Sequence, residues 1–312
     1  MITKPLVSVI INCYNGESFL KEAINSVFQQ TYDNWEIIFF DNRSTDNSKE
    51  IACSFGDKVN YFCSSKHLTL GSARKEAIKN ASGQWICFLD TDDLWYPDKL
   101  SSQVLLTSSS NSVLIYSGID NIDINGKVLN QYQPKLRCGN LLNNLLDQFD
   151  INMVTPMINS KFLFENRITF NSKIHASEEY NLFLRIAAKG LVQSVPDIHG
   201  AYRVYEGSLT DQKIEKWAID RFITLRQLNR ENKALKLNAN PFFIKAKMHA
   251  RYYSARYYMS IGNYKKAQQR LLSLRFYRTA YFLLWCLAHY PRVWDLIHQR
   301  TIKSYISKYF AR

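Results

Sequence analysis

The sequence contains no apolar run long enough to cross a membrane as a helix. Such a helix needs roughly 18 to 20 consecutive apolar residues, and the longest run, Ala280 to Ala288, reaches about half that length. The first residues show neither a basic region nor a cleavage site, so we expect no signal peptide.

Cysteine and histidine are also sparse, and neither shows a metal-binding spacing. The chain has 6 cysteines and 6 histidines, with no CxxC pair, no HExxH sequence and no histidine cluster. Cys13 and Cys87 fall in apolar runs that are typical of buried strands. We therefore expect reduced thiols in a cytoplasmic protein, and we predict neither a disulfide framework nor a zinc site.

Acidic residues are scarce toward the end of the chain. Residues 213–312 hold 21 Lys and Arg against 4 Asp and Glu, a net charge of +17, whereas residues 1–212 carry −4. Aromatic residues accompany these cations along predicted helices, which favours docking on an anionic membrane surface. The alternative is that the apolar faces form only the core of a helical subdomain. No nucleic-acid recognition motif accompanies the charge, so we expect no nucleic-acid partner.

From residue 5 to about 110, short apolar runs alternate with helical periods. Strands are predicted at residues 6–11, 35–40, 59–63 and 85–89, and helices at 17–30, 46–55, 72–81 and 97–107. This order predicts an α/β fold with a mostly parallel sheet flanked by helices. Polar clusters at 12–15, 41–43 and 90–93 follow three of the strands. They should meet beyond the carboxyl ends of the sheet, where such folds bind ligands.

After residue 110 the pattern changes. Further strands are predicted at residues 113–116, 119–124, 153–158 and 193–195, and a helix at 178–189. Asn125-Gly126 predicts a hairpin turn. From residue 211 onward the chain is predicted to be helical, divided by Pro241 and Pro291 and by a break at Gly262-Asn263.

The tetrapeptide Asp90-Thr91-Asp92-Asp93 directly follows one of the apolar strands. Its three carboxylates repel one another and are costly to desolvate unless a cation lies among them. A divalent metal that carries a phosphate ligand suits this site, because Mg²⁺ and Mn²⁺ take oxygen ligands. The alternative is an acidic turn that merely caps the following helix.

Several motifs occur in a characteristic order between residues 5 and 210. They are Val7-Ser8-Val9-Ile10-Ile11-Asn12-Cys13-Tyr14-Asn15-Gly16, Asp41-Asn42-Arg43-Ser44-Thr45-Asp46, Ala73-Arg74 and Phe88-Leu89-Asp90-Thr91-Asp92-Asp93. This set resembles the family 2 glycosyltransferases of the GT-A fold, found in bacterial surface polysaccharide or lipopolysaccharide synthesis. The resemblance implies a catalytic domain over residues 1–211, divided at about 110 into a nucleotide-sugar-binding half and an acceptor-binding half. A basic helical region would then cover residues 212–312.

The resemblance makes the tetrapeptide a DXD motif, with Asp92 and Asp93 closest to the metal and ribose and Asp90 shaping the rim. The implied cofactor is Mn²⁺ or Mg²⁺, which would neutralise the departing diphosphate. Arg74, inside a predicted helix, would contact phosphate; a surface salt bridge is the alternative.

The resemblance assigns the nucleobase to residues after the first two strands. Tyr14, Asn15 and the pair Asp41-Asn42 match its donor-binding positions, although Tyr14 also suits a half-buried core aromatic. Asn42 and Arg43 depart from the more common Asp-Asp-Gly-Ser pattern, which leaves the base open. Asp46 is predicted to brace the loop.

The pair Glu178-Glu179 resembles the family's acidic motif at the start of a helix, with Glu179 as the catalytic base and Glu178 beside it. Favourable interaction with the helix dipole is the alternative explanation. Residues 202–210 resemble a closing segment, in which Arg203 or Tyr205 would reach the diphosphate.

Together these features predict an inverting, metal-dependent glycosyltransferase, peripheral at the inner face of the cell membrane. Its expected partners are a nucleotide-diphospho-sugar donor, taken to be a UDP-sugar, and a glycan or lipid-linked oligosaccharide acceptor. A sugar nucleotidyltransferase is one alternative, but residues 12–16 lack the Gly-rich basic loop that binds triphosphate. A non-catalytic membrane scaffold is the other, and the retained acids at 92, 93 and 179 argue against it.

Overall fold

The computed structural model describes residues 4–205, 214–276 and 279–298. The chain divides into two compact units, one formed by residues 1–145 and 149–208 and the other by 146–148 and 209–312. The predicted boundary at residue 211 lies outside the described residues, so the domain limits stay a prediction.

The first unit is built on one sheet, to which the described residues contribute ten strands. Their spatial order is β3-β2-β1-β4-β9-β6-β10-β5, with β7 beside β6 and β8 beside β10. In chain order the strands are β1 (Val7–Cys13), β2 (Trp35–Asp41), β3 (Val59–Cys63), β4 (Trp85–Phe88), β5 (Leu94–Trp95), β6 (Ser112–Ile122), β7 (Val128–Tyr132), β8 (Arg137–Gly139), β9 (Met157–Asn159) and β10 (Leu191–Arg203).

Strands β3, β2, β1 and β4 run parallel, as do β6 and β10, while β9 runs antiparallel to β4 and β6. The sheet is therefore mixed, with a parallel half formed by the first part of the chain, and the predicted α/β class is confirmed. In the register of β1 and β2, Cys13 lies opposite Asp41. The loops after these strands consequently leave the sheet at the same edge.

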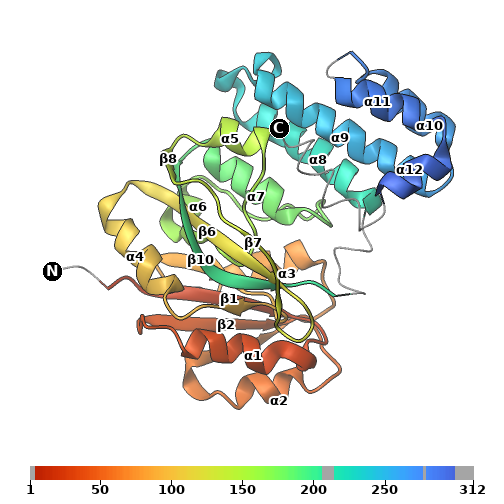
Figure 1. Cartoon of the computed structure of the whole chain (residues 1–312). Helices are drawn as coiled ribbons and strands as arrows, with labels where there is room; N and C mark the ends of the chain where they lie inside the picture. Colours follow the sequence, from red (N-terminus) through yellow and green to blue (C-terminus); the bar gives the residue numbers. More distant parts are fainter. Residues whose placement is uncertain (1–3, 206–213, 277–278, 299–312) are drawn as a thin grey trace. The chain divides into compact units, whose positions relative to one another are not determined.

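Helices cover both faces of this sheet. They are α1 (Glu17–Phe28), α2 (Ser48–Cys53), α3 (Leu70–Ile78), α4 (Lys99–Ser109), α6 (Ser160–Glu165) and α7 (Glu178–Ala187), with a short 3-10 turn, η1 (Gly56–Lys58), before β3. Figure 1 shows α1 and α2 together on one side of β1 and β2. There, Val9 and Ile11 of β1 belong to the same buried core as Leu20 and Ile24 of α1. This packing removes apolar surface from water and holds the strand ends in place.

The second half of the sheet differs from the prediction in its strand limits. The runs predicted at 113–116 and 119–124 form one strand, β6, which makes the expected hairpin with β7. Gly126 has φ +84° in that turn, a conformation that glycine adopts without strain. Strand β9 begins only at Met157, and β10 extends far beyond the predicted three residues.

The second unit is helical throughout its described residues after 213, as predicted. Its helices are α8 (Ile214–Glu231), α9 (Pro241–Ser260), α10 (Tyr264–Leu272), α11 (Thr279–Leu287) and α12 (Pro291–His298), with 3-10 turns η2 (Lys233–Leu235) and η3 (Leu237–Ala239). Helix α5 (Leu142–Asp147) spans the division between the units. None of the helices within the described ranges is long and apolar enough to cross a membrane.

The proline and glycine signals fall where the sequence predicts. Pro241 begins α9 and Pro291 begins α12, in agreement with the preference of proline for the first helical turn. Gly262, with φ +72°, lies in the turn between α9 and α10. The side chain of Asn240 caps α9 by accepting the N–H of Phe242 at 2.9 Å.

Candidate active site at the carboxyl ends of the strands

Loops after β1, β2 and β4 meet at the edge of the sheet. A Cβ atom at Gly16 would lie 2.8 Å from Oγ1 of Thr91, so the first loop approaches the tetrapeptide closely because residue 16 has no side chain. The backbone N–H of Asn15 donates to Oγ of Ser44 at 3.0 Å, and Oδ1 of Asn15 accepts the N–H of Thr45 at 2.8 Å. Asn15 therefore joins the first two loops.

Asp46 completes this framework. Its carboxylate accepts the N–H of Glu17 at 2.9 Å and the N–H of Ser48 at 3.1 Å, at the beginnings of α1 and α2. Burial opposes its ionisation, yet the hydrogen bonds from Ser48 and Glu17 hold the pKa of Asp46 below its ordinary value. The predicted bracing role of this residue is confirmed.

The three aspartates of the acidic tetrapeptide (residues 90–93) have different partners. Asp90 forms an ion pair with Arg74 at 2.5 Å. Asp93 is 1% exposed, and its Oδ1 accepts the N–H of Arg203 at 2.9 Å. Asp92 keeps part of its surface exposed, and its Oδ2 accepts the hydroxyl of Tyr205 at 3.0 Å. Of the predicted metal ligands, Asp92 is thus the accessible one.

The electrostatics of the tetrapeptide fit a bound cation. Burial, and then the charge of Asp90, raises the pKa of Asp92. Burial and the neighbouring carboxylates raise the pKa of Asp93 well above its ordinary value. In addition, Oδ2 of Asp93 is buried with no hydrogen-bond partner among the described residues. A divalent cation would offset each of these costs.

The protein's own ligand set at this place is small. In the described parts of the chain, no group of three or more His, Cys, Asp and Glu side chains is arranged to hold a metal. This fits Mg²⁺ or Mn²⁺ held by one or two carboxylates together with substrate phosphates, which is common for these ions. Asp92, the partly exposed carboxylate, would face the ion.

Arg74 connects the tetrapeptide with the start of α7. Its side chain is 4% exposed, which excludes the surface salt bridge that we weighed against a phosphate contact. Burial alone would lower the pKa of Arg74, but the charges of Asp90, Glu178 and Glu179 raise it. One buried guanidinium therefore balances acids from two distant stretches of sequence. Its contact with phosphate stays a prediction.

Glu178 and Glu179 occupy the first turn of α7, where negative charge is favourable. Glu178 is buried, and a Cβ atom at Gly71 of α3 would lie 3.2 Å from its Cγ. Glu179 is partly exposed. Of this pair, Glu179 is therefore the carboxylate that a substrate hydroxyl can approach, as the base role requires.

Among the residues predicted to hold the nucleobase, Tyr14 presents an open side chain. Tyr14 is 54% exposed, which excludes the half-buried core aromatic. The ring of His67 meets it edge to face, with the centroids 4.3 Å apart. The sequence analysis missed His67, because a single histidine in a loop has no motif around it.

Asp41 and Asn42 are held by the protein itself. Asp41 is buried, and it accepts the N–H of Ser44 at 2.7 Å and the hydroxyl of Tyr61 at 2.6 Å. The amide of Asn42 pairs with the backbone of Leu68, donating to its carbonyl at 2.9 Å and accepting its N–H at 2.8 Å. These bonds give Asn42 a bracing role, because both polar atoms of its side chain are already engaged.

Arg203 differs from its expected role at the diphosphate. The side chain is 2% exposed, and its guanidinium donates to the carbonyls of Asp92 and Ile124 and to the carboxylate of Glu22, at 2.8 to 3.0 Å. It also stacks over the ring of Phe19, 4.3 Å from the centroid. Arg203 thus holds the tetrapeptide in place by linking it through hydrogen bonds to Glu22 and Ile124. Residues 206–210 of the expected closing segment lie outside the described residues.

Residues 8–206 match the protein-family model described as Glycosyl transferase family 2. An uncharacterised glycosyltransferase of Rickettsia felis is 35% identical over 190 residues, which cover 58% of this chain and 31% of that protein. The chain therefore spans less than a third of that relative's length. The UDP-Glc:alpha-D-GlcNAc-diphosphoundecaprenol beta-1,3-glucosyltransferase WfgD of Escherichia coli is 29% identical over 214 residues, covering 68% of this chain and 82% of that protein.

The fold also resembles solved structures. TarS of S. aureus, residues 1–349 in complex with UDP-GlcNAc, superposes with a TM-score of 0.62 at 20% identity. The likeness covers 97% of this chain and 91% of that one.

Proposed function

Because this chain belongs to the family 2 glycosyltransferases, we propose that it transfers a sugar, with inversion, from a nucleotide-diphosphate donor to a hydroxyl group of a surface glycan. The observation that carries the proposal is the buried guanidinium of Arg74. It lies against Asp90 and within the field of Glu178 and Glu179, which supports a single site for donor phosphates and catalytic base. The family match leaves no support for the nucleotidyltransferase alternative.

Each residue has one task in the proposed reaction. The acceptor oxygen attacks the anomeric carbon while the bond from that carbon to the diphosphate oxygen breaks, and Glu179 takes the acceptor's proton. A divalent cation, when bound, would stabilise the negative charge on the departing nucleoside diphosphate. Asp92 would bind it, oriented by the hydroxyl of Tyr205. Tyr14 offers its exposed ring for stacking on the nucleobase.

The names of the relatives support a choice of substrates. WfgD is named for a UDP-sugar donor and a diphosphoundecaprenol-linked acceptor, and TarS is described in complex with UDP-GlcNAc. We accordingly propose a UDP-sugar donor and a lipid-linked acceptor at the inner face of the membrane. The basic helices of the second unit would approach the anionic lipid surface.

A donor screen tests this proposal. We expect one UDP-sugar to raise the Tm of the chain in the presence of Mn²⁺, and to release UDP when crude acceptor lipid is added. Addition of EDTA should reduce both effects. If no nucleotide-sugar binds or turns over with either Mn²⁺ or Mg²⁺, the enzymatic proposal fails and the non-catalytic scaffold becomes the better explanation.

A further inference from the structure

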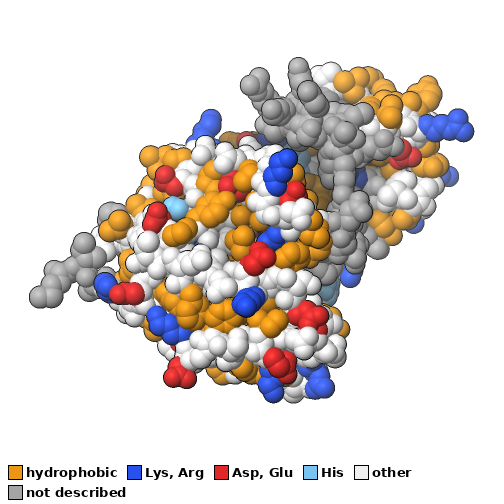
Figure 2. All heavy atoms as spheres, turned by 60° about the horizontal axis from the view of Figure 1, so that its bottom comes forward, with side chains coloured by type: hydrophobic (Ala, Val, Ile, Leu, Met, Phe, Trp, Pro, Cys, Tyr) orange, Lys and Arg blue, Asp and Glu red, His pale blue; other side chains and the backbone are white. Residues whose placement is uncertain are grey.

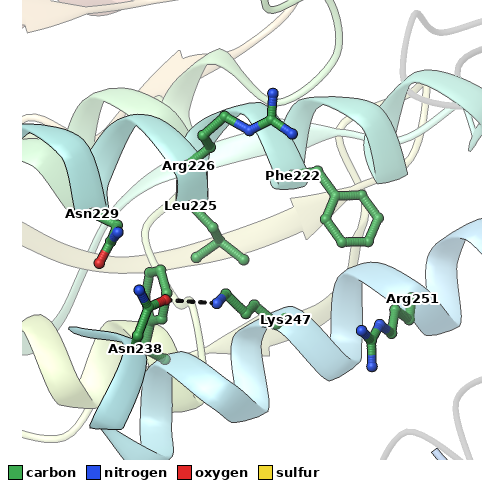
Figure 3. A pocket seen from close by; sticks show the side chains of 8 residues that line it. Phe222, Leu225, Arg226, Asn229, Asn238, Lys247 and Arg251 are labelled. Atoms are coloured by element: carbon green, nitrogen blue, oxygen red, sulfur yellow. Dashed lines mark hydrogen bonds between the residues drawn. The ribbon is translucent and has the colours of Figure 1, made fainter. Parts of the chain in front are cut away.

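A pocket of about 420 Å³ lies between α8 and α9 in the second unit. Phe222 and Arg226 of α8 line it, one helical turn apart. From α9 come Phe243, Lys247 and Arg251, again at intervals of one turn. Residues four positions apart share a face of a helix, so the pocket lies between one face of α8 and one face of α9. Figure 3 shows Phe222 and Lys247 directed into the space between the two helices.

The charge of this pocket has one sign. Arg226, Lys247 and Arg251 line it without any acidic side chain. In the part of the chain that the structure describes, none of the three forms an ion pair. Lys247 and Arg251 repel each other across one helical turn. An unbalanced cluster of this kind is stabilised by an anion.

The polar groups leave donors for such an anion. Nζ of Lys247 donates to Oδ1 of Asn238 at 2.8 Å, which uses one of its three protons and fixes its position (Figure 3). The guanidinium of Arg226 makes no hydrogen bond to any described residue. A phosphate group, with several acceptor oxygens, matches these donors.

Apolar groups form the rest of the wall. Leu225 and Phe243 are buried, and Phe222 is 37% exposed. Nζ of Lys247 lies 4.9 Å from the centroid of the Phe243 ring. A free phosphate ion would gain nothing from this surface, whereas a ligand with both a phosphate and an apolar part would use the whole pocket.

We propose that this pocket binds the phosphate-bearing headgroup of an anionic membrane lipid. Lys247, directed into the space between the two helices, would hold the phosphate, Arg226 and Arg251 of the pocket wall would add attractive charge, and the apolar wall would take the adjoining acyl region. The net charge of +17 over residues 213–312 agrees with an anionic surface as the partner. Exposed Phe276, Leu283 and Tyr290 give the same unit apolar groups that can enter a lipid interface. The inference rests on the proposed function, to which it adds a defined site of membrane contact.

Vesicle flotation with the full chain tests the pocket. The test variant is Arg226→Gln/Lys247→Gln/Arg251→Gln, and the matched control is Lys265→Gln/Arg270→Gln/Arg292→Gln, which removes three exposed cations that do not line the pocket. With phosphatidylcholine vesicles containing phosphatidylglycerol, the test variant should bind at least about tenfold more weakly than the control. Equal losses would overturn the proposal in favour of diffuse surface attraction.

Further arms separate the ligand sources and control for misfolding. Inorganic pyrophosphate at millimolar concentration should compete only weakly; if it abolishes flotation of the unsubstituted chain, the pocket takes soluble phosphate and the lipid assignment is wrong. If the triple Gln variant misfolds, Arg226→Lys/Lys247→Arg/Arg251→Lys replaces it in the test. This charge-conserving variant should bind vesicles like the unsubstituted chain. Loss of binding in this charge-conserving variant, with an unchanged circular dichroism spectrum, would also contradict the proposal. Donor binding is measured without vesicles, so its failure counts against the proposed function alone.

Discussion

Within each acidic group of the active site, one carboxylate is buried while a neighbour stays partly exposed. Asp93 is buried and Asp92 partly exposed, and likewise Glu178 is buried and Glu179 partly exposed. The buried members receive support from Arg203 and Arg74, which reduces the cost of desolvating their charge. The exposed members are therefore the ones to which we assign metal binding and proton transfer.

Replacement of Glu179 should separate catalysis from binding. Glu179→Gln keeps the size and shape of the side chain but cannot accept the proton, so transfer should fall by about 10²- to 10⁴-fold. Donor affinity, measured by titration calorimetry with Mn²⁺, should change little. Glu165→Gln, an exposed residue of α6, serves as the control. Full transfer activity in Glu179→Gln would remove this residue as the base.

Metal binding should depend on pH through Asp92 and Asp93. Their pKa values are raised in the folded chain, so these carboxyls ionise at a higher pH than the ordinary value of about 4 found in the unfolded chain. Over that window, rising pH lowers the free energy of unfolding, because the unfolded chain binds fewer protons. A cation binds the ionised form of these carboxyls, so metal binding should restore the free energy of unfolding that is lost as the pH rises.

The measurement is the rise in Tm on adding Mn²⁺, taken at several pH values. The rise should grow as the pH increases above the ordinary carboxyl value of about 4, and it should be largely absent in Asp92→Asn. Asp57→Asn, an exposed residue in η1, should behave like the unsubstituted chain. A metal-induced rise that persists in Asp92→Asn at all pH values would contradict the assignment.

At the level of single residues, the sequence predicted which residue types lie at the candidate site but not which partners each one contacts. Asn42 and Arg203 carry the expected polar groups, and both were predicted to bind the donor. The structure engages them with Leu68 and with the tetrapeptide instead. Such partners lie 26 and 111 positions away in the chain, a distance that local patterns do not report.

Among the secondary-structure elements, long and regular ones were predictable and short ones were not. The parallel strands β1, β2 and β4 are recognisable as apolar runs because both of their faces are buried. Strand β5 has two residues and β8 has three, too few to show a period. In β10 the pairing with β6 shifts register between Ser194 and Ile198, where Pro196 lacks an N–H to donate. This irregularity concealed a strand of 13 residues.

The end of β10 should be essential for the stability of the tetrapeptide. Arg203→Met removes a buried cation that bonds to three other segments, and we expect it to lower the free energy of unfolding by about 3 to 5 kcal/mol. The measurement is chemical denaturation followed by fluorescence. Lys75→Met, at an exposed position of α3, should cost less than about 0.5 kcal/mol. A comparable loss in both variants would refute the fastening role of Arg203.

Across the whole molecule, charge is divided by sign and by unit. Figure 2 shows acidic and basic side chains interspersed over the face of the first unit that it presents, in keeping with the net charge of −4 over residues 1–212. The cations in excess belong to the other part of the chain. Composition alone predicted this division, because charge counts need no knowledge of the fold.

Raising the salt concentration should therefore weaken membrane binding much more than donor binding. Because ions screen exposed charges beyond about 8 to 10 Å at physiological ionic strength, binding to anionic vesicles should weaken strongly between about 0.05 and 0.5 M NaCl. Donor binding should weaken much less, because its charged groups are close together and partly buried. Flotation and donor titration across the same salt series provide the measurement. Salt-independent flotation would show that apolar contacts govern the docking.

The different surroundings of Asp90, Asp92 and Asp93 have a consequence for recognising inactive relatives. The three residues are all aspartates, so a search for the motif treats them as equivalent. Their different surroundings depend on Arg74, which pairs with Asp90, and on Arg203, which donates to Asp93; both arginines lie outside the motif. A related chain that keeps all three aspartates but has lost either arginine would still be classified as an enzyme by its motif. The first substitution that inactivates such a relative would then be at one of the two arginines, while its three aspartates remain unchanged.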